Sequence, residues 1–345
     1  MGASRVEDRL TVIVPAYNEA ATVAETVRSL QEQGVRPREI VVVDDCSTDD
    51  TAEIARATGA TVVQPPANTG SKAGAQSFAL RGVDTELAMA VDADTTLAPD
   101  AIEKLLAAFD DPEVAAACGF VLPRRVRTIW ERGRYIEYML AFGFFKRVQD
   151  HLGNPLISSG CFSMYRTAEL REIGGWSMRT MAEDMDLTWT LYQRGRRVRF
   201  LPEAASYPIE PHNYEFMGKQ LQRWSHGFVQ NVRLHWRSIL DLGYLRSLVA
   251  VAMWDAIFAS LAYLVLLPAL SIAIDPLILL AYLVDAPVIL VPVLWQAAHR
   301  GEIARALASL PSFFVLRVVN AVFMLRALWR ETVVDRPLLV YEKGH

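Results

Sequence analysis

The stretch Thr85-Glu-Leu-Ala-Met-Ala-Val-Asp-Ala-Asp-Thr-Thr96 joins an apolar run to a pair of acidic residues. The run from Leu87 to Val91 has the length and composition of a buried strand, and Asp92 and Asp94 follow it directly. Ligands of open α/β sheets bind beyond the carboxyl ends of the strands, where two carboxylates can share a divalent cation that bridges to phosphates. The pattern predicts a nucleotide or sugar-nucleotide site, and its alternative is a turn or helix capped by Asp.

Strands and helices alternate around this stretch. Strands are predicted at residues 10–15, 40–44 and 61–63, and helices at 18–34, 48–59, 76–81 and from 99 onward. Ser47 or Thr48 is expected to cap the second helix, which Gly59 would end. Alternation at this spacing indicates a mostly parallel sheet with helices on both faces.

The composition changes along the 345-residue chain. Its hydrophobic fraction of 52% and mean hydropathy of +0.17 are high for a soluble enzyme, and the excess lies beyond residue 243. We predict a cytosolic α/β domain with interfacial helices over residues 1–240, followed over 241–345 by a membrane region with two to three transmembrane helices and a short C-terminal tail. A net charge of −4 and a pI of about 5.9 argue against nucleic acid as a partner.

The cysteines and the N-terminus both indicate a cytosolic setting. Cys46, Cys118 and Cys161 lie far apart without metal-type spacing, so we expect reduced thiols. Residues 1–9 are polar, and the apolar run after them is too short for a signal peptide. We therefore expect the N-terminus to remain in the cytosol.

Three apolar stretches follow residue 243. Residues 245–274 and 277–298 are each long enough to span a bilayer, although Asp255 and Asp285 interrupt them. These acids would contact a polar chain in transit or lie near the membrane interface. The distribution of Lys and Arg puts the short link between the two stretches outside and the loop after them in the cytosol.

The third stretch, residues 313–329, contains Arg317, Asn320 and Arg326. If it spans the membrane, Arg317 and Asn320 must face other helices or a wet cavity, because charge is costly in lipid. The alternative is a helix at the membrane interface. Residues 124–150 mix arginines with aromatic residues, which suits either a helix on the membrane surface or one that packs its aromatic side chains on the sheet.

Further polar groups are expected at the sheet edge that carries Asp92. Asp44 and Asp45 end the second predicted strand, where they can accept hydrogen bonds from a base or ribose. Residues 68–74, Asn-Thr-Gly-Ser-Lys-Ala-Gly, form a turn before a helix, where backbone N–H groups and Lys72 can meet phosphate.

Two later motifs suit transfer chemistry. Glu183 and Asp184 precede a predicted helix, so one carboxylate can act as a general base, or both can simply favour the helix dipole. Gln220, Arg223 and Trp224 share one face at helical spacing. Arg can bind a diphosphate and Trp can stack on a sugar ring, whereas a purely packing face would not select Gln and Arg.

Taken together, these motifs resemble the family-2 inverting glycosyltransferases, in particular the membrane-embedded branch with hyaluronan, cellulose, chitin and poly-N-acetylglucosamine synthases. The resemblance covers roughly residues 10–230 and is carried by Val14-Pro-Ala-Tyr-Asn-Glu19, Asp44-Asp45-Cys-Ser-Thr-Asp49, Lys72-Ala-Gly74, Asp92-Ala-Asp94, Glu183-Asp184 and Gln220-x-x-Arg223-Trp224. It implies a GT-A fold, a Rossmann-like α/β mixed sheet with helices on both faces, followed here by a C-terminal transmembrane helical region. It also implies a nucleoside-diphosphate sugar donor, usually UDP-linked.

The resemblance implies a role for each motif. Asp184 of the Glu183–Asp184 pair would deprotonate the acceptor hydroxyl, and Asp92 with Asp94 would hold Mg²⁺ or Mn²⁺ on the diphosphate. The residues expected to bind the nucleotide sugar are Pro15, Tyr17, Glu19, Asp44, Asp45, Lys72, Asp92, Gln220, Arg223 and Trp224. The residues expected to bind the acceptor are Ser159, Gly160, Cys161 and Trp224.

Some features depart from the pattern of the family. Cys46 replaces the usual Gly after the Asp pair, and Ala182 stands where Thr often precedes Glu-Asp. The chain starts with the catalytic domain, and two or three spans could hardly enclose a polysaccharide channel in a monomer. We therefore expect either a growing polysaccharide acceptor, served by a homo-oligomer or a partner export subunit, or transfer of one or a few sugars to a lipid-linked or cell-surface acceptor.

These expectations place the protein in the cell membrane as a multi-pass enzyme in contact with lipid, with its catalytic domain in the cytosol. A nucleotidyltransferase would also use acidic metal sites, but it gives no reason for the Gln220–Trp224 face. A membrane scaffold with a degenerate transferase domain would be expected to have lost the metal or base carboxylates, and all of them are present.

Overall fold

The computed structural model describes residues 9–338 except 154 and 285, and these residues form two compact units. The first unit comprises residues 9–124 and 147–209, and the second comprises 125–146 and 210–338. The domain division predicted at residues 240 and 241 stays a prediction.

The first unit is built on an eight-stranded sheet in the order β3-β2-β1-β4-β7-β6-β8-β5. Its strands are β1 (Leu10–Ala16), β2 (Glu39–Asp44), β3 (Thr61–Val63), β4 (Leu87–Val91), β5 (Thr95–Leu97), β6 (Val114–Val121), β7 (Phe162–Arg166) and β8 (Arg197–Pro208). The four strands from β3 to β4 are parallel, whereas β7 runs antiparallel to both β4 and β6. The strands β6 and β8 are parallel to each other, and β5 runs antiparallel to β8. The sheet is therefore mixed, as the GT-A fold requires, with β7 and β5 as its antiparallel strands.

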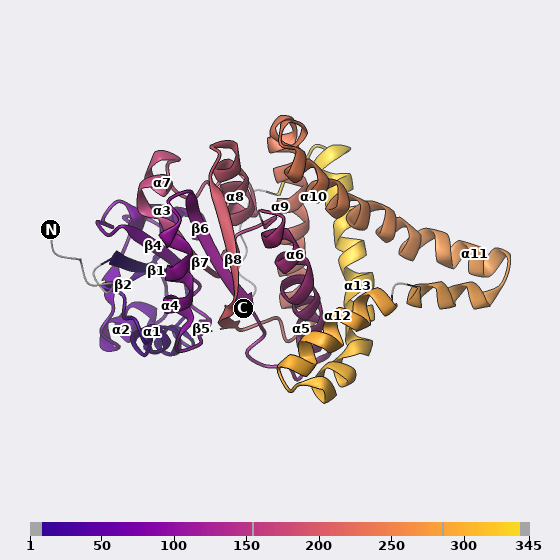
Figure 1. Cartoon of the computed structure of the whole chain (residues 1–345), viewed down its shortest axis with the longest axis horizontal. Coiled ribbons are helices and arrows are strands. Elements are labelled where there is room, and N and C mark those ends of the chain that lie inside the picture. The colour runs from indigo at the N-terminus through magenta and orange to yellow at the C-terminus, as the bar shows by residue number, and fades with distance from the viewer. Residues whose placement is uncertain (1–8, 154, 285, 339–345) are drawn as a thin grey trace. The chain divides into compact units, whose positions relative to one another are not determined.

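Helices cover both faces of this sheet, with α1, α2 and α4 on one side and α3 and α7 on the other (Figure 1). The helices of the unit are α1 (Val23–Gln31), α2 (Thr51–Ala57), α3 (Lys72–Leu80), α4 (Ala101–Leu106), the 3₁₀ turn η2 (Ala107–Asp110), α7 (Thr167–Glu172) and α8 (Glu183–Gln193). The short helix α6 (Lys146–His151) begins at the boundary of the two units.

Three predicted helices begin elsewhere, and α3 begins at Lys72 rather than at residue 76. Helix α1 begins at Val23, because Asn18 adopts a left-handed backbone (φ 55°) in a bend and residues 20–22 form a turn. Helix α2 begins at Thr51 after Asp50 rather than after Ser47 or Thr48. The hydroxyl of Ser47 instead accepts the N–H of Asn18 at 2.9 Å, so it joins two loops at the sheet edge.

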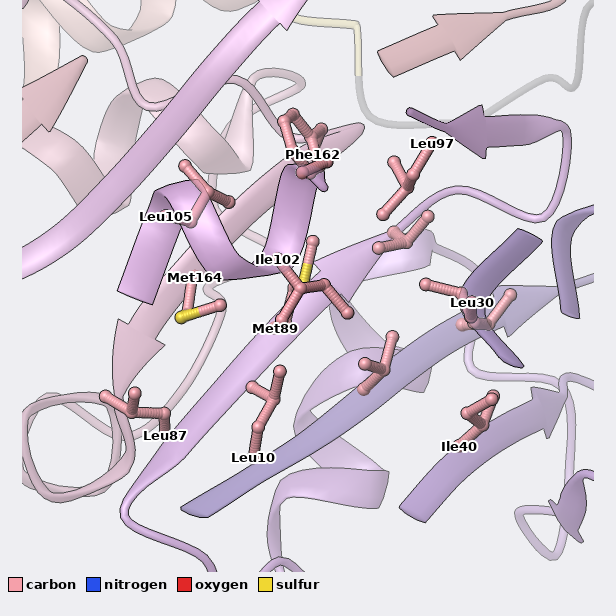
Figure 2. Packing of buried hydrophobic residues seen from close by; sticks show 14 of the residues in the cluster. Leu10, Leu30, Ile40, Leu87, Met89, Leu97, Ile102, Leu105, Phe162 and Met164 are labelled. Atoms are coloured by element: carbon pink, nitrogen blue, oxygen red, sulfur yellow. The ribbon is translucent and has the colours of Figure 1, made fainter. Parts of the chain in front are cut away.

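The core of the first unit lies between the sheet and the helices α1 and α4. Figure 2 shows Leu10, Leu87 and Met89 on neighbouring strands packed against Ile102 and Leu105 of α4. Continuous apolar strands of this kind are buried on both faces, so that polar side chains can leave the sheet only at its rim. Gly119 of β6 is required by packing, because a Cβ there would lie 2.1 Å from Cε1 of Phe162.

The second unit is helical. Its elements are α5 (Ile129–Leu140), the π-helix η3 (Ala141–Phe145), α9 (Tyr214–Asp241), α10 (Gly243–Met253), the π-helices η4 (Trp254–Ala259) and η5 (Ala262–Leu266), α11 (Leu267–Ala273), the 3₁₀ helix η6 (Pro276–Leu283), α12 (Ala286–His299) and α13 (Ile303–Thr332). Three stretches are long and apolar enough to cross a membrane, namely Gly243–Ala273, Pro276–His299 and Ile303–Thr332. The first two form the hairpin that contains α11 (Figure 1).

Polar residues of the third stretch face other helices. The guanidinium of Arg317 lies 3.7 Å from a carboxylate oxygen of Asp255 and 4.7 Å from the ring centre of Tyr263. Asn320 donates to Glu137 of α5 at 3.2 Å. Arg317 and Asn320 therefore each have a partner on another helix, as a spanning α13 would require, and the span itself stays a prediction. The other predicted intramembrane acid, Asp285, lies outside the described residues.

The aromatic and basic stretch at 124–150 folds in large part as α5, which packs against α12 and α13 within the second unit. Tyr135 and Tyr138 are buried there, whereas Phe144 and Phe145 of η3 are exposed. A capping box between Thr128 and Glu131 fixes the start of α5. The surface location of this stretch at a membrane stays a prediction.

Candidate active site

The two predicted metal-binding carboxylates follow β4 directly. Asp92 comes after the last residue of β4, and Asp94 precedes β5. Arg124 fixes the turn, because its guanidinium donates to the carbonyl of Asp94 at 2.6 Å and to that of Tyr207 at 3.2 Å. The hydroxyl of Thr95 donates to the Asp94 carboxylate at 3.1 Å. Both acids therefore stand at the rim of the sheet, where the sequence placed them.

Lys72 joins three segments that are distant in sequence. It is the first residue of α3, whose N-cap Ser71 accepts the N–H of Gly74 at 3.1 Å. Its ammonium forms an ion pair with the Asp92 carboxylate and donates to the carbonyl of Gly160 at 2.9 Å. A carboxylate oxygen of Glu183 lies 3.8 Å from the same ammonium.

Glu183 and Asp184 form the first turn of α8. One carboxylate oxygen of Asp184 accepts the N–H of Gly160 at 2.8 Å, and the other accepts the N–H of Met185 at 2.9 Å. A Cβ at residue 160 would lie 2.8 Å from Asp184 Oδ2, so this close approach of backbone and carboxylate needs a glycine. Burial raises the pKa of Glu183, the charge of Asp184 adds to this effect, and the Lys72 ammonium opposes it.

The pair Asp44 and Asp45 organises the neighbouring loops. Both residues are buried. The two carboxylate oxygens of Asp45 accept the N–H and the hydroxyl of Thr69, each at 2.8 Å. The Asp44 carboxylate accepts the N–H of Ser47 at 3.1 Å. Asp45 therefore fixes the loop that leads to Lys72, and contact of either acid with a base or ribose stays a prediction.

The first motif lies next to this loop. Glu19 accepts the hydroxyl of Thr22 at 2.8 Å, while its N–H donates to the hydroxyl of Thr51 at 2.7 Å. Tyr17 is 40% exposed and Pro15 is half-buried, so Tyr17 is the residue of this motif that solvent and ligands reach most easily.

The predicted acceptor residues Ser159, Gly160 and Cys161 form the turn before β7. The carbonyl of Ser159 accepts the hydroxyl of Ser163 at 2.7 Å, and the carbonyl of Cys161 accepts the N–H of Asp92 at 3.3 Å. This turn therefore ties the loop after β4 to the start of α8. The three cysteines are free thiols, as expected.

The remaining predicted residues belong to the second unit, on α9. Gln220 accepts a hydrogen bond from Arg134 of α5 at 2.6 Å, and its amide nitrogen lies 3.5 Å from Glu210. The guanidinium carbon of Arg134 lies 4.5 Å from the ring centre of Trp224, whose side chain is 40% exposed. Arg223 is half-buried on the same helix.

The carboxylates of Asp92 and Asp94 suit a hard divalent cation, because carboxylate oxygens are the ligands that Mg²⁺ and Mn²⁺ prefer. Across the described part of the chain, no group of three or more His, Cys, Asp or Glu residues is placed to hold a metal. Two carboxylates are nevertheless an ordinary protein contribution where substrate phosphates and water complete the coordination. The residues present therefore fit such an ion.

The structure brings Lys72, Asp92, Gly160, Glu183 and Asp184 together. The sequence reasoning missed the supporting residues Arg124, Thr69, Arg134 and Glu210. Only for Arg134 did the sequence hold a signal, since an Arg in a helix with several aromatic residues has to be paired where it is buried.

A sequence profile and the sequences of curated relatives both indicate the same family. Residues 11–174 match the sequence profile described as Glycosyl transferase family 2. Poly-beta-1,6-N-acetyl-D-glucosamine synthase of Staphylococcus aureus is 28% identical over 223 residues, which cover 63% of this chain and 54% of the relative. The same enzyme from Staphylococcus epidermidis matches to the same extent. The chain thus spans about half the length of these curated relatives.

A solved structure is similar over almost the whole chain. The mannosyltransferase PcManGT from Pyrobaculum calidifontis, solved in complex with GDP-Man and Mn²⁺, superposes with a TM-score of 0.66 at 20% identity. The match covers 95% of this chain and 88% of the other. It confirms the GT-A-type mixed α/β sheet followed by long apolar helices.

Proposed function

Because this chain belongs to glycosyl transferase family 2, whose members are enzymes, we propose that it is a membrane-bound inverting glycosyltransferase. It moves a sugar from a nucleoside-diphosphate sugar, UDP-linked by preference, to a growing polysaccharide acceptor. The general base is Asp184, and Asp92 and Asp94 hold Mg²⁺ or Mn²⁺.

One observation carries this proposal. The carboxylates of Asp92, Glu183 and Asp184 come from two segments about 90 residues apart, and Lys72 and Gly160 connect them at the rim of the sheet. Several acids held around one ammonium cost free energy unless bound ligands offset their charge. The chemistry that suits this arrangement is the binding of an anion through a cation, next to a base.

The reaction follows from the place of Asp184. Each of its oxygens accepts one backbone N–H, and a carboxylate oxygen can accept more than one hydrogen bond, so the same carboxylate can also accept an acceptor hydroxyl. As Asp184 takes the hydroxyl proton, the acceptor oxygen attacks the anomeric carbon and the bond from that carbon to the diphosphate breaks. The diphosphate leaves with the bonding electrons, and the single displacement inverts the anomeric centre.

The leaving diphosphate needs positive charge. A divalent cation, when bound by Asp92 and Asp94, supplies most of that charge. Lys72 contributes a second cation from the start of α3. In this proposal Asp44, Asp45, Pro15, Tyr17 and Glu19 contact the nucleotide. Gln220, Arg223 and Trp224 contact the diphosphate and the acceptor, which Ser159, Gly160 and Cys161 also face.

The three long apolar helices support a membrane location with the sheet-containing unit in the cytosol. A glycan or glycolipid acceptor would then bind and receive the sugar near the lipid surface. A homo-oligomer or a partner export subunit would contribute to any channel for a growing polysaccharide.

The proposal is tested by incubating detergent-purified protein with Mn²⁺ and a panel of UDP and GDP sugars. The measurements are nucleotide release and the mass of the product. Release of a nucleoside diphosphate without pyrophosphate supports glycosyl transfer, and pyrophosphate would indicate nucleotidyl transfer. A ladder of products supports a growing polysaccharide, whereas a single mass increment indicates transfer of one sugar to a lipid-linked or cell-surface acceptor.

A further inference from the structure

Arg134 is a charged side chain that is fully buried within the second unit. It lies near the middle of α5, and its exposed fraction is 0%. A buried guanidinium is costly unless its charge and its donors are satisfied, so its partners indicate why it is retained. Two acids supply the charge: Glu137 forms an ion pair with it on the same helix, and Glu210 lies 3.5 Å from its Nε.

The other partners of Arg134 are the residues that we assign to ligand binding on α9. One terminal nitrogen donates to Oε1 of Gln220 at 2.6 Å. The guanidinium also lies over the indole of Trp224, with its carbon 4.5 Å from the ring centre. A planar guanidinium can make both contacts at once, whereas a lysine ammonium is a point charge without a stacking face.

These contacts determine which end of the Gln220 amide is available. An arginine can only donate, so the amide oxygen of Gln220 has to face Arg134. The amide nitrogen then donates one N–H to Glu210 at 3.5 Å, and an amide NH₂ has a second N–H that can serve a ligand. An anionic diphosphate accepts hydrogen bonds and does not donate them, so the NH₂ end is the useful one. Without Arg134 the amide could rotate and present its oxygen to the phosphate.

The same cluster reaches the third apolar stretch. Glu137 accepts a hydrogen bond from Asn320 of α13 at 3.2 Å, and Tyr138 of α5 donates to Glu210 at 2.8 Å. The position of Arg134 is therefore fixed from three sides, by α5 itself, by α13 through Glu137, and by the segment before α9 through Glu210.

We propose that Arg134 is a positioning residue of the transferase, which orients Gln220 and Trp224 for the nucleotide diphosphate. This inference rests on the proposed function, because it concerns the same site. Arg134 is fully buried and therefore acts through these two side chains rather than by touching the substrate itself.

The test is a double-mutant cycle with Arg134→Lys and Gln220→Ala in the full-length protein. Arg134→Lys keeps a positive charge between Glu137 and Glu210, so the fold retains its buried ion pairs. The matched control is Tyr135→Phe, which removes a buried hydroxyl of the same helix whose partner is Glu302 rather than a residue of α9. Turnover of UDP-N-acetylglucosamine and GDP-mannose with Mn²⁺ gives kcat and KM, and a thermal melt reports folding.

Arg134→Lys is expected to reduce kcat/KM roughly tenfold or more, mainly through a higher KM for the donor. A loss of this size corresponds to one charge-assisted hydrogen bond. The same change in the Gln220→Ala background is expected to have a much smaller effect. Tyr135→Phe should leave both constants unchanged. Equal losses in both backgrounds, or wild-type kinetics of Arg134→Lys, would overturn the inference and leave the proposed function standing. If the wild type turned over neither donor, both this inference and the proposed function would be overturned.

Discussion

Replacement of Asp184 by Asn tests the proposed base directly. Asn keeps the shape of the side chain but cannot take a proton from an acceptor hydroxyl. General base catalysis by a positioned side chain is worth roughly 10²–10⁴ in rate, so we expect kcat to fall by about that factor. Binding of UDP should remain nearly intact, because the nucleotide contacts are assigned to other residues.

The structure also gives the cost of this change to the fold. The two oxygens of Asp184 accept the N–H groups of Gly160 and Met185, and Asn has only one oxygen. One backbone N–H would then face the amide NH₂ and lose its partner, which costs about 1–3 kcal/mol. This loss lowers the melting temperature but is too small to unfold a typical domain.

Asp186→Asn is the matched control, because it makes the same change two residues further along α8. Asp186 is buried and accepts two hydrogen bonds from Arg179, at 2.8 Å and 2.7 Å, so Asn loses one acceptor there as well. The stability costs should be similar, and only Asp184→Asn should lower kcat by roughly 10²–10⁴. Nucleotide release, UDP calorimetry and thermal melts measure the three quantities. Turnover of Asp184→Asn within about tenfold of the wild type, or an equal loss in Asp186→Asn, would refute the assignment.

Three further outcomes follow from the same geometry. Asp94→Ala should weaken UDP binding measured by calorimetry with Mn²⁺ and leave metal-free binding unchanged; equal losses in both conditions would contradict its role as a metal ligand. Gly119→Ala should destabilise the first unit by about 1–3 kcal/mol or more, because its Cβ would overlap the ring of Phe162, whereas Gly82→Ala, with 3.7 Å of clearance, is the control in thermal melts. Burial raises the pKa of the Glu210 carboxyl in the folded protein above its ordinary value of 4.5. The stability that Glu210 contributes is therefore fully present below pH 4.5, and it is lost as the pH rises through the pKa of the folded state. The melting temperature of the wild type should therefore fall relative to that of Glu210→Gln as the pH is raised from 4.5 towards 8, and a constant difference would exclude this effect.

Local patterns predicted the strands that carry the site with good accuracy. The run Leu87–Val91 is β4 as expected, and the predicted strand at 61–63 is β3. Helix starts were less predictable, because the polar residues after β1 and β2 bond to each other across the two loops. The hydroxyl of Ser47 binds the N–H of Asn18 instead of capping its own helix. Such contacts between loops leave no signal at any fixed spacing in the sequence.

The mixed character of the sheet is a further case. Alternating βα units predicted mostly parallel strands, and this holds for β3, β2, β1 and β4 and for the pair β6 and β8. The insertion of β7 antiparallel between β4 and β6 depends on pairing between residues about 75 apart for β4 and about 47 apart for β6. Only the resemblance to the family indicated it, because strand direction is a property of the tertiary connection and not of a local pattern.

The sequence by itself determined the family, the βα units, the acidic ends of the strands and the apolar stretches, since each of these depends on residue type at short spacing. The tertiary structure alone decided which groups meet. It placed Lys72 between Asp92 and Glu183, set the N–H of Gly160 on Asp184, and buried Arg134 beside Gln220. Contacts of this kind join residues from about 20 to about 110 positions apart, and their geometry follows from the packing of whole elements, which no local pattern of residues encodes.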